Sequence, residues 1–127
     1  MIFENEISPI QLENDILTSA GINKIIAVGN SGYDVKVEIA KKTGGLDVIA
    51  GRNSFKFLYN GKSPTNDVVT GPYLTIVYRN GDKRTGDSVL LVQDSTFGKY
   101  LGFLQVTFDD QGKSHTTVGT PYYWIIP

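Results

Sequence analysis

Hydrophobic positions in the first part of the chain predict a helix, a strand, a second helix and a second strand. Residues 9–20 carry apolar side chains every three or four positions, which indicates an amphipathic helix, and residues 33–42 repeat that spacing. The runs 25–29 and 46–50 are apolar throughout, as is typical of strands buried on both faces of a parallel sheet. Two such strands joined through a helix predict a right-handed crossover unit.

Capping residues mark both ends of the first predicted helix. Ser8 is expected to cap its start, with Pro9 in the first turn and Gln11 completing a capping box, and Gly21 is expected to end it. The residues expected on its apolar face are Ile10, Leu12, Ile16 and Leu17.

After residue 51 the pattern changes to strands separated by polar turns. Residues 60–71 predict a surface loop, and Asn80-Gly81 is a hairpin signal. The strands predicted in this part are 73–78, 88–93, 100–108 and 116–126. The whole pattern predicts an α/β fold, a mixed β-sheet of about six strands with two N-terminal helices.

Composition limits the classes of function. A chain of 127 residues predicts one domain over residues 1–127. The net charge is -1 and the basic residues are scattered, so we expect no nucleic-acid partner. No apolar run approaches the roughly 20 residues that span a bilayer, so we expect no membrane partner. The absence of cysteine excludes disulfides and thiol chemistry.

Two glycine-rich turns follow the two predicted parallel strands, where catalytic groups of α/β sheets usually lie. They are Gly29-Asn30-Ser31-Gly32 and Gly51-Arg52-Asn53-Ser54. Two interpretations stay open. Gly-Asn turns are common as plain loop geometry. Alternatively, the turns form the polar rim of a ligand crevice, and the flanking Arg52 and Lys56 favour an anion there.

Three sequence blocks carry a resemblance to a known family. They are GLDVIAG at residues 45–51, FLYNGKSP at 57–64 and FGKYLG at 97–102. In order and spacing they resemble the 5′-nucleotidase/apyrase family, and residues 23–29 resemble the strand that precedes these blocks. The resemblance implies a truncated family member that corresponds to the second half of the N-terminal metallophosphatase domain, which is half of a sandwich.

The resemblance also implies that catalysis is lost. The family's later metal ligands fall at Asn30, Asn53 and Phe55 here, and its earlier ligands have no counterpart. A two-metal site needs several imidazoles and carboxylates, and asparagine is a poor substitute for imidazole toward transition metals. We therefore expect no divalent metal, no catalytic residue and no enzymatic activity.

The family context suggests what replaced catalysis. Shortened, inactive relatives are expected in blood-feeding arthropods, where free haem is an abundant toxic ligand. The first hypothesis is a non-enzymatic haem-binding or haem-scavenging protein, secreted into haemolymph or saliva as a mature chain without signal peptide. A face bared by the missing half-domain must be covered by repacking, by self-association, or by a small apolar, anionic ligand such as haem. The alternative is a secreted salivary interaction protein, anti-haemostatic or nucleotide-sequestering, that acts through residues 60–71.

Few side chains can coordinate a haem iron. The candidates are His115, the only histidine, together with Tyr59 and Tyr100. Each also has a plainer interpretation, as an exposed turn residue for His115 and as packing residues for the tyrosines. Arg52 and Lys56 are expected near the haem propionates.

Overall fold

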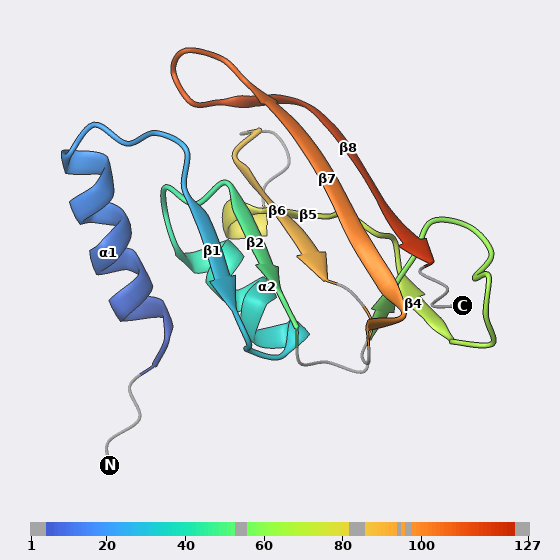
Figure 1. The fold of residues 1–127 in the computed structure, drawn as a ribbon. Coiled ribbons are helices and arrows are strands. Elements are labelled where there is room, and N and C mark those ends of the chain that lie inside the picture. Colours follow the sequence, from blue (N-terminus) through green and yellow to red (C-terminus); the bar gives the residue numbers. More distant parts are fainter. Residues whose placement is uncertain (1–4, 53–55, 82–85, 94, 96–97, 124–127) are drawn as a thin grey trace.

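The computed structural model describes residues 5–52, 56–81, 86–93, 95 and 98–123 (Figure 1). The helices are α1 (Ile7–Ser19) and α2 (Tyr33–Lys42), with a short 3-10 turn η1 (Arg79–Gly81). The strands are β1 (Ile26–Gly29), β2 (Val48–Gly51), β3 (Phe57–Leu58), β4 (Val69–Gly71), β5 (Thr75–Tyr78), β6 (Ser88–Gln93), β7 (Tyr100–Phe108) and β8 (Ser114–Tyr123).

The main sheet has the strand order β1-β2-β6-β5, in which the first three strands are parallel and β5 is antiparallel to β6. The α/β fold and the β1-α2-β2 crossover are confirmed. The remaining strands do not join this sheet, since β3 pairs with β4 and β7 pairs with β8. The expected sheet of about six strands is therefore divided into a four-stranded sheet and two ribbons.

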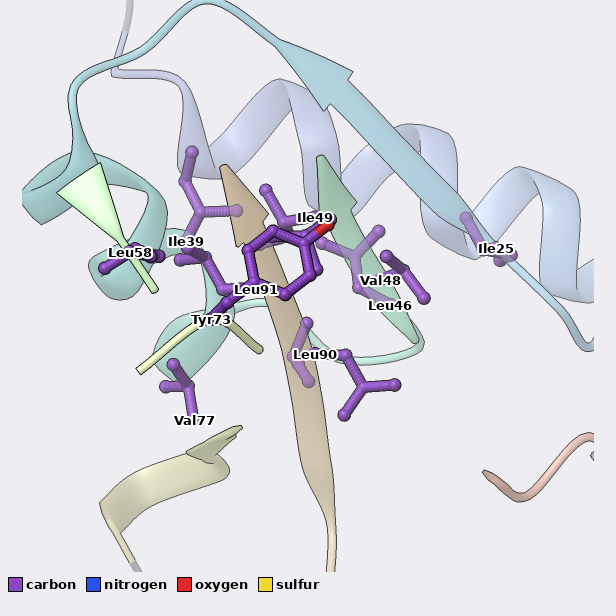
Figure 2. Packing of buried hydrophobic residues seen from close by; sticks show 13 residues of the cluster. Ile25, Ile39, Leu46, Val48, Ile49, Leu58, Tyr73, Val77, Leu90 and Leu91 are labelled. Carbon is purple, nitrogen blue, oxygen red and sulfur yellow. The ribbon is translucent and has the colours of Figure 1, made fainter. Parts of the chain in front are cut away.

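The core lies on both faces of the main sheet. On one face, Ile39 of α2 packs with Ile49 and Leu91 (Figure 2), and Ala40 of α2 belongs to the same buried cluster. The β7–β8 hairpin crosses the other face, where Leu104 approaches the sheet (Figure 1). Each large aliphatic side chain buried in this way contributes about 1.5–3 kcal/mol, so the central strands β2 and β6 anchor the fold.

Several elements match their predicted bounds. Helix α2 covers residues 33–42 as expected, with Asp34 in its first turn and Lys41 and Lys42 in its last, where each charge favours the helix dipole. Strands β6 and β7 also match. At the hairpin signal, Asn80 and Gly81 both have positive φ angles, of 53° and 70°.

The start of α1 differs from its prediction. The helix begins at Ile7, whose N–H donates to Asn5 Oδ1 at 3.0 Å, so Ser8 lies inside the first turn and does not cap it. Gln11 does not complete a capping box either, because its side chain exchanges hydrogen bonds with the backbone of Gly44. The predicted capping box is wrong.

The buried face of α1 also differs. Ile10 and Leu17 pack toward the core as expected, but Leu12 and Ile16 are 61% and 53% exposed. Asn14 is buried instead and donates to Gly44 O at 2.9 Å. This bond and those of Gln11 turn a polar stripe of the helix inward, which hydrophobic spacing alone does not predict.

Strand β1 is not buried on both faces, as the apolar run 25–29 suggested. Ile26 and Val28 are 62% and 82% exposed, whereas Val48 and Ile49 of β2 are buried. Among the described residues, β1 pairs only with β2, and β2 lies between β1 and β6. The prediction of full burial is therefore right for β2 and wrong for β1.

Gly51→Ala tests the tightest backbone contact of the sheet. A Cβ at Gly51 would lie 2.0 Å from Gly29 O and 2.8 Å from the end of the Lys36 side chain. We expect the substitution to lower the free energy of unfolding by about 1–3 kcal/mol through overpacking, measured by urea denaturation. Gly29→Ala is the matched control, because a Cβ there meets nothing within 4 Å. Equal effects of the two substitutions would contradict this account.

Candidate functional site

The carboxyl ends of three parallel strands meet at one edge of the main sheet. Gly29, Gly51 and Gln93 lie side by side in the strand register. Asn30 and Arg52 follow the first two directly, so the described part of each glycine-rich turn begins at this edge. Asn53 and Phe55 lie outside the described residues.

A buried lysine, which sequence analysis missed, lies beneath this edge. Lys36 of α2 is 1% exposed, and its ammonium donates to Arg52 O and, at 3.0 Å, to Gln93 Oε1. Gln93 Nε2 in turn donates to Lys56 O at 2.9 Å. This network ties the chain on both sides of residues 53–55 to the sheet. The signal was present, since Lys36 precedes Ile39 and Ala40 by three and four residues and so shares their inward face.

Burial lowers the pKa of Lys36 from its usual value of 10.5. Both of its hydrogen-bond acceptors are neutral, and no carboxylate of the described residues lies within 4 Å of its ammonium. Desolvation therefore disfavours the charged form without a compensating ion pair. Among the described residues, this buried ammonium has no counter-charge.

The two cations predicted at this edge, Arg52 and Lys56, differ in exposure and in pairing. Arg52 is exposed. Lys56 Nζ lies 2.7 Å from Asp34 Oδ1 and 4.7 Å from the centre of the Tyr33 ring. Lys56 is thus already paired, and Arg52 is the exposed cation at the edge.

An aromatic cluster continues from Lys56. It consists of the rings of Phe57, Tyr59, Tyr100 and Tyr123. The ring centres of Phe57 and Tyr100 are 4.4 Å apart, and those of Tyr59 and Tyr100 are 6.2 Å apart. The structure therefore brings together two of the three candidate haem donors.

The hydroxyl of Tyr100 is already engaged. It lies 2.6 Å from Thr65 Oγ1 and donates to Asp67 Oδ2 at 3.2 Å, and Tyr100 is 5% exposed. The Thr65 hydroxyl, and then Lys99 and Tyr100, hold the pKa of Asp67 below its usual range. Tyr100 fastens the loop of residues 60–71, so Tyr59 is the more accessible of the two candidate haem donors in the cluster.

The structure does not bring His115 together with the tyrosines. Tyr100 pairs with Tyr123 at one end of the β7–β8 hairpin, whereas Phe108 pairs with Ser114 at the other. At about 3.4 Å per residue this separates His115 from Tyr100 by roughly 25 Å. His115 Nε2 lies 2.9 Å from Asp109 Oδ2, and the Lys113 N–H, followed by His115, lowers the pKa of Asp109.

The described part of the chain holds no group of three or more His, Cys, Asp or Glu side chains placed to bind a metal ion. Asn30 and Arg52 supply an amide and a guanidinium at the strand ends instead. In the same part of the chain, no helix is long and apolar enough to cross a membrane. The described strand ends therefore offer an exposed guanidinium and, beneath them, a buried ammonium.

Similar proteins cover almost the entire sequence, although no family model matches it. The 5′-nucleotidase of Diplobatis ommata is 50% identical over 109 residues, which cover 86% of this chain and 18% of that protein. The mouse enzyme is 44% identical over 121 residues, which cover 95% of this chain and 20% of that protein. Over the compared residues, the chain belongs to the 5′-nucleotidase family. It spans about a fifth of the length of the curated relatives it matches.

Solved structures agree with this assignment. The 5′-nucleotidase precursor of Thermus thermophilus superposes with a TM-score of 0.79 at 31% identity, covering 96% of this chain and 23% of its own. NAD nucleotidase of Haemophilus influenzae superposes with a TM-score of 0.83 at 26% identity, and the match covers 95% of this chain and 21% of that one. The resemblance stated from the sequence blocks is confirmed, and the fold corresponds to part of a 5′-nucleotidase.

Lys36→Met tests the unbalanced buried charge. Because the pKa of Lys36 is lower in the folded state, its contribution to stability is present above the unfolded value of 10.5 and is lost as pH falls through the folded value. We expect the stability of the protein to rise toward about pH 10 relative to that of Lys36→Met, measured by urea denaturation at several pH values. The exposed Lys41→Met variant is the control and should keep the pH dependence. Identical profiles for all three proteins would contradict the assignment.

Proposed function

We propose that this chain is a non-enzymatic haem-binding protein built on a 5′-nucleotidase fold. The observation that carries the proposal is the aromatic cluster of Phe57, Tyr59, Tyr100 and Tyr123 beside the cationic strand edge. A porphyrin is flat and apolar and carries two propionates, so it suits aromatic rings bordered by positive charge.

The geometry favours different roles for the candidate residues. Tyr59 is half-buried, and in this proposal its phenolate is the axial donor to iron. Tyr100 is buried and supports the cluster by packing against Phe57, while its hydroxyl holds Thr65 and Asp67. Arg52 is exposed and pairs with a propionate, whereas Lys56 must exchange its partner Asp34 to do so. His115 lies too far away to share this site.

We propose that hydrolysis is absent. The relatives of this chain are named 5′-nucleotidases, but Asn30 and Asn53 stand where the family resemblance expects metal-binding histidines. Amides hydrogen-bond to phosphate but are poor ligands for transition metals. In this proposal the turns bind anions but hold no metal ion that would activate a water molecule.

The protein should release no phosphate from ATP, ADP or AMP. The assay is phosphate release with Mg²⁺, Ca²⁺, Mn²⁺ or Zn²⁺ present, with a catalytically active 5′-nucleotidase as the positive control. The expected rate equals that of buffer, because the described residues hold no metal-binding group. Activity that co-elutes with the protein through successive purification steps would overturn this prediction.

Haemin should bind with a saturable Soret shift. We expect Tyr59→Phe to change the Soret band and the charge-transfer band of high-spin ferric iron, since it removes the proposed donor. Arg52→Ala should weaken binding by about 0.5–1 kcal/mol, and less at high salt, because an exposed ion pair is screened. The measurement is an absorption titration at two ionic strengths.

Two controls accompany this titration. His115→Ala should leave spectrum and affinity unchanged, because His115 lies at the far end of the hairpin. Tyr122→Phe is the matched tyrosine control, since Tyr122 lies on the hairpin but outside the cluster, against Phe103. An unchanged spectrum in Tyr59→Phe refutes tyrosinate ligation there, and no Soret shift at all refutes haem binding.

A second candidate function, that of a secreted interaction protein, is supported by the loop of residues 60–71. The Tyr100–Thr65–Asp67 network fastens this loop, while Val68 at its end is 78% exposed. A fastened loop that displays an apolar side chain is a suitable contact surface for another protein. Secretion is proposed because relatives include snake venom 5′-nucleotidases. Saturable binding of AMP in place of haemin would favour the nucleotide-sequestering form of this alternative.

A further inference from the structure

A cavity of about 320 Å³ lies between α1 and the main sheet. It follows the length of β1, with α1 forming one wall and α2 and β2 the other. Its apolar lining includes Ile10, Leu17, Ala27, Ile39 and Ile49. Its lining also includes the exposed Ile26 and Val28 of β1, so the cavity opens to solvent.

The way α1 is attached explains why the cavity is open. The helix is held by polar contacts, in which Gln11 and Asn14 bond to Gly44 and the Ser31 hydroxyl donates to Glu6 Oε2 at 2.7 Å. These bonds fix the helix above the sheet without filling the space beneath it. The Ser31–Glu6 bond joins the start of α1 to the turn after β1.

The two ends of the cavity differ in polarity. Leu17, Ile25 and Leu46 line one end, whereas Ser31 and Lys36 line the end near the strand edge. The Lys36 ammonium has three donor hydrogens and, among the described residues, bonds only to Arg52 O and Gln93 Oε1. One donor is therefore left for a ligand, and the charge beside the cavity has no counter-ion from the described protein.

We propose that this cavity binds a medium-chain carboxylic acid, with its alkyl chain along β1 and its carboxylate at Lys36. An apolar cavity of about 150 Å³ is enough to hold benzene, so the present volume suits a chain of roughly eight to ten carbons. A carboxylate supplies the negative charge that Lys36 lacks. The site is distinct from the aromatic cluster and does not depend on haem binding.

Calorimetric titration with octanoate, decanoate and decan-1-ol tests the ligand class. We expect saturable binding of one molecule per chain, tighter by about fourfold for each added methylene. Lys36→Met should weaken decanoate at least tenfold and change decan-1-ol by less than about twofold, because only the acid uses the charge. Lys41→Met, an exposed lysine of the same helix, should bind both as the unmodified protein does. Equal losses for acid and alcohol in Lys36→Met would overturn the assignment of the carboxylate.

A second variant locates the ligand. Ala27→Phe fills the cavity and should abolish binding, whereas Val118→Phe, at an exposed position of β8, should not. Because Ala27→Phe can also unfold the protein, methyl NMR of the unmodified chain gives an independent test. Decanoate should shift the methyl signals of Ile10 and Ile49 and leave that of Ile76, on the distant strand β5, in place. No saturable binding, or shifts confined to Ile76, would refute the site.

Discussion

The close approach of Gly51 to Gly29 and Lys36 is the constraint on which the rest of the structure depends. Only a residue without a Cβ lets the Lys36 side chain pass over β2, since a Cβ there would lie 2.8 Å from its ammonium. From that position Lys36 reaches Gln93 on the next strand and the backbone of Arg52. One missing methyl group therefore couples α2 to the ends of two parallel strands, and it places the Lys36 ammonium beneath those strand ends.

The same coupling positions the aromatic cluster. Gln93 receives a bond from Lys36 and gives one to Lys56 O, which fixes the chain as it enters β3. Phe57 is the next residue, and its ring packs against Tyr100, which begins the long hairpin. The hairpin bonds to the main sheet through no strand ladder among the described residues, so this packing helps to hold it across the sheet. Hydrogen bonds and ring packing thus connect the strand edge to the aromatic cluster.

Sequence patterns predicted the elements whose hydrophobic spacing agrees with their packing. Helix α2 and strands β6 and β7 are of this kind, and their observed bounds match the predicted ones. Strand β1 looked like β2 because both are continuous apolar runs, yet position in the sheet and not composition decides that Val28 is exposed and Ile49 buried. The rotation of α1 was mispredicted for a similar reason, since long-range hydrogen bonds from Gln11 and Asn14 to Gly44 override its hydrophobic spacing.

For the site, the sequence placed Asn30 and Arg52 at one edge and could not place His115, because hairpin pairing fixes that distance. Lys36 escaped notice because lysine is almost never buried without a partner. The burial of Lys36 against neutral partners has an energetic consequence. Burying an ammonium against neutral acceptors costs stability, and replacing it by an apolar side chain would remove this cost. The Lys36 ammonium beside an apolar cavity, together with the exposed Arg52, gives this end of the fold the positive charge on which the proposed anion sites rest.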